Sequence, residues 1–205
     1  MREKGRVIAF LGPDGSGKST LIDGLKKELD ERNINYRYFH WRIPWKKRKS
    51  KSGPANVVVD PHGKPIYPIT KACIKLIWLF CMSWPAWFRH ARPALNKGDW
   101  VILDRGIWDI IPDNKRYRLP RWEKFYLFMV KLFPKAETMY ILHCNAQIIY
   151  DRKQEVSFHE LQRQCQAYHD LSQHMGTLVD VSKSPEDICN HHYPALFSEQ
   201  QDFSQ

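Results

Sequence analysis

The stretch GPDGSGKST, residues Gly12–Thr20, decides the fold of this chain. It fits the pattern G-x-x-x-x-G-K-[ST], in which glycines let successive backbone N–H groups turn inward and form a concave nest for an anion. A helix that begins at Lys18 aims its positive end at the same anion. We therefore expect a nucleotide's phosphates here, with Lys18 at the β- and γ-phosphate oxygens and the Ser19 hydroxyl on Mg²⁺. The loop residues expected to bind the nucleotide are Gly12, Asp14, Gly15, Ser16, Gly17, Lys18, Ser19 and Thr20.

The residues on both sides of the loop agree with this interpretation. The run Arg6–Leu11 is mainly apolar and typical of a buried strand, and Leu21, Leu25 and Leu29 follow at helical spacing. A strand, a glycine-rich turn and a helix are the context that the motif requires. An ordinary glycine-rich turn that matches by chance is therefore disfavoured.

Strands and helices are predicted to alternate along the rest of the chain. Strands are expected at 36–41, 99–104, 138–144 and 177–181, and helices at 18–32, 69–91, 119–133, 147–152, 157–175 and from 184 onward. This alternation predicts one α/β domain over residues 1–205. The expected fold is a P-loop NTPase of three α/β/α layers, with a mainly parallel sheet of roughly five strands.

Two segments need separate interpretation. Residues 44–68 contain the cationic run Lys46–Lys49, several prolines and glycines and few apolar residues, so we interpret them as a mobile basic loop. It either closes over an anionic acceptor or is a solvated linker.

Residues 69–91 form a helix that is apolar on most sides and kinked at Pro85. Such a helix is usually core or a subunit interface, and docking on a membrane surface is the alternative.

Composition sets the class of protein and of partner. The chain has 205 residues, a hydrophobic fraction of 43% and a formal charge of +10, from 32 Lys and Arg against 22 Asp and Glu. These values are typical of a soluble globular domain with anionic partners. A nucleotide kinase also needs positive charge, so nucleic-acid binding does not follow. The sequence predicts a cytoplasmic location for three reasons. The five cysteines include no C-x-x-C pair, and no secretory signal is visible. The apolar run Leu76–Phe88 is too short to span a bilayer.

A carboxylate is expected beside the phosphate loop. Asp104 ends the predicted buried strand 99–104, and Arg105 follows it directly. In phosphate-loop enzymes, a carboxylate at the tip of the neighbouring strand holds Mg²⁺ directly or through water. Ligands of open α/β sheets collect at this carboxyl edge. The predicted metal site therefore consists of Ser19 and Asp104.

Four segments, taken in order, resemble the thymidylate kinase-like phosphate-loop kinases. They are the loop Gly12–Thr20 with its acidic Asp14, the helix end and strand Arg92–Arg105 that lead to an Asp-Arg motif, the strand segment Phe133–Leu142, and Arg152-Lys153 followed by a helix with Tyr168. Together they cover most of the chain. The resemblance implies an ATP- and Mg²⁺-dependent phosphotransferase with this fold.

The resemblance also implies roles on the nucleotide side. Lys18 and Ser19 would hold the ATP phosphates and Mg²⁺, and Asp104 would help position the metal. Lys183, after the last strand, would lie where family members hold adenine.

Further roles follow on the acceptor side. Arg105 would grip the acceptor's phosphate, because a guanidinium can hold two phosphate oxygens at once. Asp14 would face an acceptor hydroxyl or phosphate. Arg152 would reach over the transferring phosphoryl group from a short lid at 152–157, with help from Lys153. The residues expected to act in catalysis are thus Lys18, Asp14, Arg105 and Arg152.

The sequence departs from the family in ways that leave the acceptor open. Gly106 stands where the family usually has an aromatic residue, and Ser83 stands where thymidylate kinases carry an arginine that packs on the thymine. The pattern Asp109…Asp113…Tyr117-Arg118, with Arg152-Lys153-x-Glu155, looks more like a divergent branch, one associated with bacterial surface-polysaccharide gene clusters. A nucleoside monophosphate is the simplest acceptor, and a sugar or glycan hydroxyl is the alternative. A non-catalytic nucleotide-binding regulatory protein is the alternative from another class. The helix 69–91 would be a homodimer face, as in family members.

Overall fold

The structure is a computed structural model that describes residues 5–41, 65–152 and 156–198. Most of the predicted basic loop at 44–68 lies outside the described residues, and so do residues 153–155 of the predicted lid, Lys153 among them.

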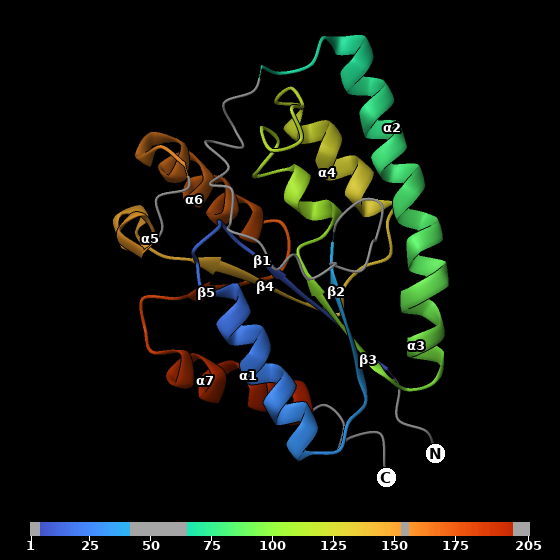
Figure 1. The fold of residues 1–205 in the computed structure, drawn as a ribbon, viewed down its shortest axis with the longest axis vertical. Helices are drawn as coiled ribbons and strands as arrows, with labels where there is room; N and C mark the ends of the chain where they lie inside the picture. The colour runs from blue at the N-terminus through green and yellow to red at the C-terminus, as the bar shows by residue number, and fades with distance from the viewer. Residues whose placement is uncertain (1–4, 42–64, 153–155, 199–205) are drawn as a thin grey trace, which may run out of the picture.

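Five strands form one sheet in the middle of the molecule (Figure 1). They are β1 (Val7–Leu11), β2 (Tyr36–His40), β3 (Trp100–Asp104), β4 (Thr138–His143) and β5 (Thr177–Asp180). Their order is β2-β3-β1-β4-β5, and every neighbouring pair is parallel. The predicted α/β fold with a parallel five-stranded sheet is confirmed. Because β1 lies in the centre, the loop after it emerges between the carboxyl ends of β3 and β4.

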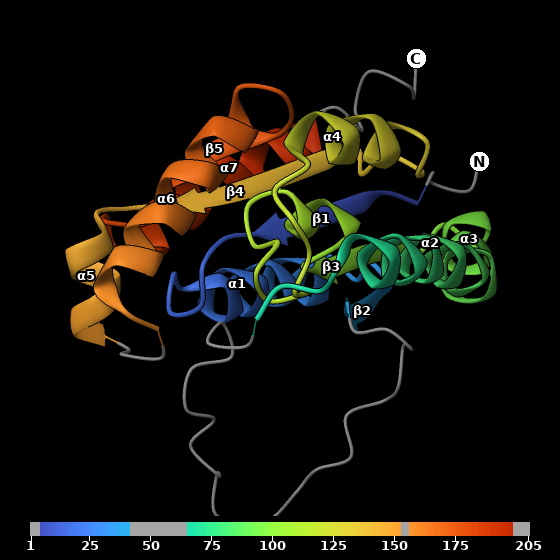
Figure 2. The same cartoon turned by 90° about the horizontal axis from the view of Figure 1, so that it is seen from above.

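Helices pack on both faces of the sheet (Figure 2). They are α1 (Lys18–Glu31), α2 (Ile69–Ala86), α3 (Arg92–Asn96), α4 (Glu123–Lys131), α5 (Ala146–Arg152), α6 (Phe158–Ser172) and α7 (Pro185–Ser198). Along β1, Ile8 and Phe10 belong to the core under α1 and α7, whereas Val7, Ala9 and Leu11 belong to the core under α2 and α4. A strand buried on both faces is continuously apolar, as the sequence of β1 is.

Prolines make α4 shorter than the predicted helix at 119–133. Leu119 precedes Pro120, and Phe133 precedes Pro134. A residue before proline is disfavoured in the α conformation because it clashes with the proline ring. The helix therefore begins at Glu123 and ends at Lys131.

The predicted helix at 69–91 is interrupted by a wide turn. After α2, residues Trp87–Ala91 form the π-helical turn η1, in which the N–H of Arg92 donates to the carbonyl of Trp87, and α3 follows. Pro85 lies just before this turn, inside α2. Proline removes one helical hydrogen bond and crowds the carbonyl four residues earlier, and π-helical turns accompany such kinks. A π-helical turn thus begins two residues after the proline at which the kink is expected.

Candidate phosphate-binding and transfer site

Gly12 and Gly17 show why the loop between β1 and α1 contains glycine. Gly12 has φ 151°, and a Cβ there would lie 2.9 Å from Ser16 Oγ and 3.0 Å from Leu142 Cβ. Gly17 has φ 86°, in the left-handed region, and α1 begins at the next residue, Lys18. Only glycine adopts such conformations without strain. The backbone therefore turns sharply at its glycines and leads into the amino end of α1, as an anion nest requires.

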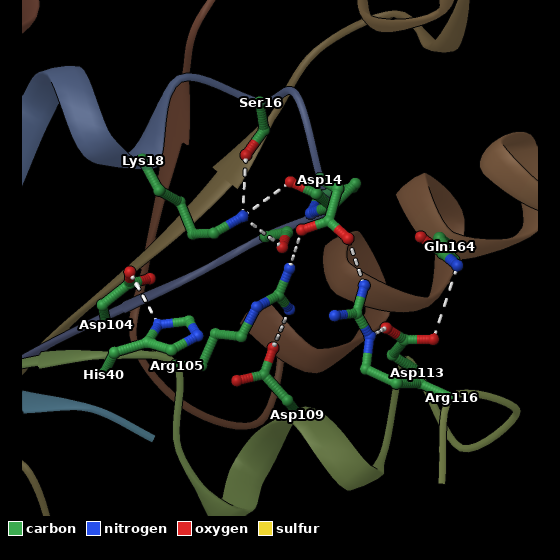
Figure 3. Close-up of polar contacts among 12 residues, drawn as sticks. Asp14, Ser16, Lys18, His40, Asp104, Arg105, Asp109, Asp113, Arg116 and Gln164 are labelled. Atoms are coloured by element: carbon green, nitrogen blue, oxygen red, sulfur yellow. Dashed lines mark hydrogen bonds and ion pairs between the residues drawn. The ribbon is translucent and has the colours of Figure 1, made fainter. Parts of the chain in front are cut away.

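Lys18 is buried within this loop (Figure 3). Its Nζ donates hydrogen bonds to the carbonyl oxygens of Gly12 at 2.7 Å and Pro13 at 2.6 Å. Burial and then the charge of Arg105 lower the pKa of Lys18 to about 7, although the carboxylate of Asp14 acts in the opposite direction. At neutral pH the Lys18 side chain is therefore present in both its charged and its neutral form, inside the loop that is predicted to hold phosphates.

This pKa predicts proton uptake on nucleotide binding. At pH 8 the Lys18 amine is mostly neutral, and a bound triphosphate favours the charged ammonium, so we expect an uptake of about one proton by this group. At pH 6 the amine is already protonated, and its contribution falls to near zero. Isothermal titration calorimetry with ATP and magnesium, in buffers of different ionisation enthalpy, measures the uptake. The variant Lys18→Met serves as the control, and equal uptake by both proteins at pH 8 would contradict the assignment.

Asp104 lies at the carboxyl edge of the sheet, between two other strands. It pairs in register with Phe10 of β1 and with His40 of β2. Its Oδ2 accepts a hydrogen bond from the Tyr38 hydroxyl at 2.9 Å and lies 2.9 Å from His40 Nδ1. Burial raises the pKa of Asp104, but the interactions with His40 and Tyr38 outweigh burial, and the pKa lies below its ordinary value. The side chain is a carboxylate in a fixed orientation.

The other oxygen of Asp104 fits a metal ligand. Its Oδ1 is buried and has no hydrogen-bond partner among the described residues. Mg²⁺ prefers oxygen ligands and is usually held by one or two carboxylates together with substrate phosphates and water. The described part of the chain contains no cluster of three or more His, Cys, Asp or Glu side chains that could hold a metal ion unaided. Asp104 and Ser19 would therefore hold Mg²⁺ together with the nucleotide's phosphates.

Arg105 is buried in an unusual backbone conformation. Its φ is 70°, in the left-handed region, which costs a non-glycine residue about 1–3 kcal/mol. Its backbone N–H donates to Phe10 O at 2.9 Å. Its guanidinium contacts Asp14, lies 3.2 Å from Asp109 Oδ1 and lies 3.4 Å from the Tyr168 hydroxyl. The backbone strain is compensated by these contacts, which hold the guanidinium beside the phosphate loop.

Asp14 lies between two guanidinium groups (Figure 3). One carboxylate oxygen contacts Arg105, and the other contacts Arg116. Burial raises the pKa of Asp14, but the charges of Arg105, Arg116 and Lys18 outweigh burial and hold the pKa far below its ordinary value. Sequence reasoning did not single out Arg116, because its position depends on how the segment after β3 folds back over the loop.

Two aspartates in that segment have an internal role. Asp109 is fully buried; its Oδ1 accepts from the Tyr168 hydroxyl at 2.5 Å and its Oδ2 from the Gly106 N–H at 2.8 Å. Asp113 lies 2.6 Å from Arg116 Nε. Asp109 therefore fixes Arg105, and Asp113 fixes Arg116.

The glycine that departs from the family pattern has a packing reason. A Cβ at Gly106 would lie 2.3 Å from the ring of Trp108. Trp108 is itself buried and meets Phe133 edge to face at 6.1 Å. Ser83 is buried too, and its hydroxyl donates to Leu79 O in its own helix at 2.7 Å. Trp108 therefore occupies the space that an aromatic side chain at residue 106 would need.

Two other predicted residues, Arg152 and Lys183, are exposed. Arg152 is the last residue of α5, and Lys183 lies between β5 and α7. The structure brings Lys18, Asp14 and Arg105 together but places neither Arg152 nor Lys183 among their described contacts. The roles of all these residues stay predictions.

A hollow of about 500 Å³ lies at the carboxyl end of β4. It is lined by His143, Cys144, Asn145, Ala146, His159, Gln162, Arg163, Cys165 and Gln166. None of the predicted site residues lines it, and no motif in the sequence marked it, because its walls come from the β4–α5 connection and from α6.

The parallel sheet and the loop that follows its central strand define an α/β protein of the P-loop NTPase fold. Among curated proteins, the chain is 32% identical over 114 residues to a thymidylate kinase of Bdellovibrio bacteriovorus, covering 51% of this chain and 46% of that protein. It is 29% identical over 102 residues to a thymidylate kinase of Marinomonas sp. (50% and 45% covered). It is 30% identical over 104 residues to one of Mycoplasma mobile (49% and 46% covered). These matches confirm the predicted resemblance.

The matches are partial. The chain spans about half the length of the curated relatives it matches. No protein-family model matches the chain.

Proposed function

We propose that the chain is a kinase that transfers a phosphoryl group from ATP, with Mg²⁺, to a nucleoside monophosphate. The observation that carries the proposal is the convergence of Lys18, Asp14, Asp104 and Arg105 around one phosphate loop. The relatives that support it are named thymidylate kinases. Phosphoryl transfer needs little covalent help from a protein, and positioned charge of this kind supplies most of the catalysis.

The chain's own residues would divide the work. An acceptor oxygen attacks the γ-phosphorus, the bond to the β,γ-bridging oxygen breaks, and ADP leaves with the electron pair of that bond. Lys18 would neutralise charge on the β- and γ-phosphates, and Arg105 would orient the acceptor beside Asp14. Bound Mg²⁺, held by Ser19 and Asp104, would supply further neutralisation of the phosphate oxygens.

One observation favours a second candidate, a kinase of a sugar or glycan hydroxyl. Each guanidinium at the acceptor side already contacts two carboxylates: Arg105 contacts Asp14 and Asp109, and Arg116 contacts Asp14 and Asp113. A phosphate-bearing acceptor would compete with these carboxylates for the same donors. A neutral hydroxyl acceptor would not compete for these donors, and it would donate a hydrogen bond to Asp14, whose low pKa does not suit it to take the proton itself.

A panel of acceptors separates the candidates. We expect ADP formation, measured with the whole chain, ATP and magnesium, to rise at least about tenfold with dTMP or another nucleoside monophosphate. Stimulation by free sugars or glycans alone would favour the second candidate. Tight ATP binding without stimulation by any member of the panel would contradict both and favour a regulatory nucleotide-binding protein.

A further inference from the structure

Arg116 is the more accessible of the two arginines that contact Asp14. Its side chain is 27% exposed, whereas the side chain of Arg105 is 5% exposed. The guanidinium of this buried arginine contacts Asp14, Asp109 and the Tyr168 hydroxyl. Arg105 is therefore enclosed by the protein, and Arg116 lies at the edge of the site, where a ligand that enters from solvent can reach it.

The hydrogen bonds of Arg116 leave one of its nitrogens uncommitted. Its Nε donates to Asp113 Oδ2 at 2.6 Å, and its Nη2 donates to Asp14 (Figure 3). Within residues 5–41, 65–152 and 156–198, Nη1 has no hydrogen-bond partner. An arginine carries five N–H donors, so both N–H groups of Nη1 are available to a ligand. Phosphate oxygens suit such donors, because hydrogen bonds between charged partners are about twice as strong as those between neutral ones.

Contacts with α6 hold the segment that carries Arg116. Lys115 contacts Glu160, and Gln164 Nε2 donates to Asp113 Oδ1 at 3.4 Å. Glu160 and Gln164 are both buried and lie one turn apart on α6. The carboxylate that holds Arg116 is thus itself held. A guanidinium fixed in advance loses little side-chain freedom when a ligand binds, and it therefore binds the ligand more tightly.

The charges beside Arg116 determine what an acceptor meets there. Burial lowers the pKa of Arg116, but the carboxylates of Asp113 and Asp14 outweigh both burial and the repulsion of Arg105, and the pKa lies above its ordinary value. Asp113 is buried, whereas the side chain of Asp14 is 33% exposed. An acceptor therefore meets one cation, Arg116, beside one carboxylate, Asp14. A phosphate suits the cation, and a sugar hydroxyl suits the carboxylate.

We propose that Arg116 binds the phosphate group of the acceptor and selects phosphorylated acceptors over neutral ones. The inference rests on the proposed function and assigns this selection to one residue. Arg116 Nη1 donates to the phosphate oxygens while Nε and Nη2 keep their contacts with Asp113 and Asp14. The phosphate therefore does not have to displace either carboxylate from Arg116. An acceptor without a phosphate leaves Nη1 to water and gains nothing from its charge.

Binding of dTMP and thymidine, two ligands that differ by one phosphate, tests the proposal. Isothermal titration calorimetry measures both Kd values for the whole chain with magnesium and a non-hydrolysable ATP analogue. Arg116→Gln is expected to weaken dTMP binding by about 10- to 100-fold, the usual effect of losing hydrogen bonds to a charged group, and to change thymidine binding by less than about threefold. Arg116→Lys keeps the charge without the planar fork, so it should restore part of the dTMP affinity.

A matched control and a second pair of ligands keep the result specific. Arg121→Gln removes an exposed arginine between this segment and α4 and should leave both Kd values unchanged. Equal melting temperatures show that the variants fold. If another phosphorylated acceptor of the panel binds more tightly than dTMP, that acceptor and its dephosphorylated form replace the pair.

The outcomes separate this inference from the proposed function. If dTMP stimulates ADP formation but Arg116→Gln leaves its Kd unchanged, or weakens dTMP and thymidine equally, only the role of Arg116 is wrong. If the ATP analogue binds and no phosphorylated acceptor does, or if only neutral sugars stimulate ADP formation, the inference is overturned together with the proposed function.

Discussion

Replacement of Lys18 by alanine is expected to lower ADP formation by about 10³-fold while the protein stays folded. Removal of a single preorganised charge donor from a transfer site typically costs this much in rate. The fold should tolerate the change, because burial lowers the pKa of Lys18 to about 7 and the folded state therefore disfavours its charge. Steady-state ADP release with saturating ATP and acceptor measures the rate, and thermal unfolding measures the stability.

A lysine on the same helix provides the control for that experiment. Lys27 is exposed and pairs only weakly with Glu31 at 3.8 Å, so Lys27→Ala should leave ADP formation unchanged. If Lys18→Ala kept more than about a tenth of the activity, the phosphate-binding role of this loop would be wrong.

The change Arg105→Ala is expected to affect both acceptor use and stability. It should lower kcat/KM for the acceptor by about 10²-fold or more, with the Kd for ATP changed only a few fold. It should also lower the free energy of unfolding by about 3–5 kcal/mol, because Asp109 is fully buried and loses its ion-pair partner. Acceptor-dependent kinetics and urea denaturation measure the two effects separately.

A second substitution separates those two effects. Asp109→Asn removes the buried charge, so in the Arg105→Ala background it should restore part of the lost stability. It should not restore acceptor use, since the guanidinium is still missing. If the double variant recovered acceptor kinetics along with stability, Arg105 would act only through folding. If Arg105→Ala instead lost ATP affinity and kept normal acceptor kinetics, Arg105 would belong to the nucleotide side of the site.

The sequence predicted the sheet and the phosphate loop because both depend on local patterns. A buried parallel strand is a short apolar run, as Val7–Leu11 is. The glycines that follow this run are typical of a tight loop. The carboxylate at the end of β3 could be predicted as well, because β3 ends where its apolar run ends. In each case a few consecutive residues carry the whole signal.

Other parts of the site depend on contacts between distant segments. Tyr38 and His40 reach Asp104 because β2 lies beside β3, and the order of strands in a sheet is not written in any one strand. Arg116 reaches Asp14 across a sequence separation of 102 residues. The apolar residues of α2 likewise left core, subunit interface and membrane surface open, because which of its side chains are exposed depends on the neighbours that cover the others.

A crystal structure of the chain with magnesium and a non-hydrolysable ATP analogue tests the central claim most directly. The account predicts the β- and γ-phosphates on the backbone N–H groups of the loop Gly12–Thr20, beside Lys18 Nζ. It also predicts Mg²⁺ on Ser19 Oγ and, directly or through water, on Asp104 Oδ1. A nucleotide bound elsewhere on the chain, or a metal ion remote from Asp104, would contradict it.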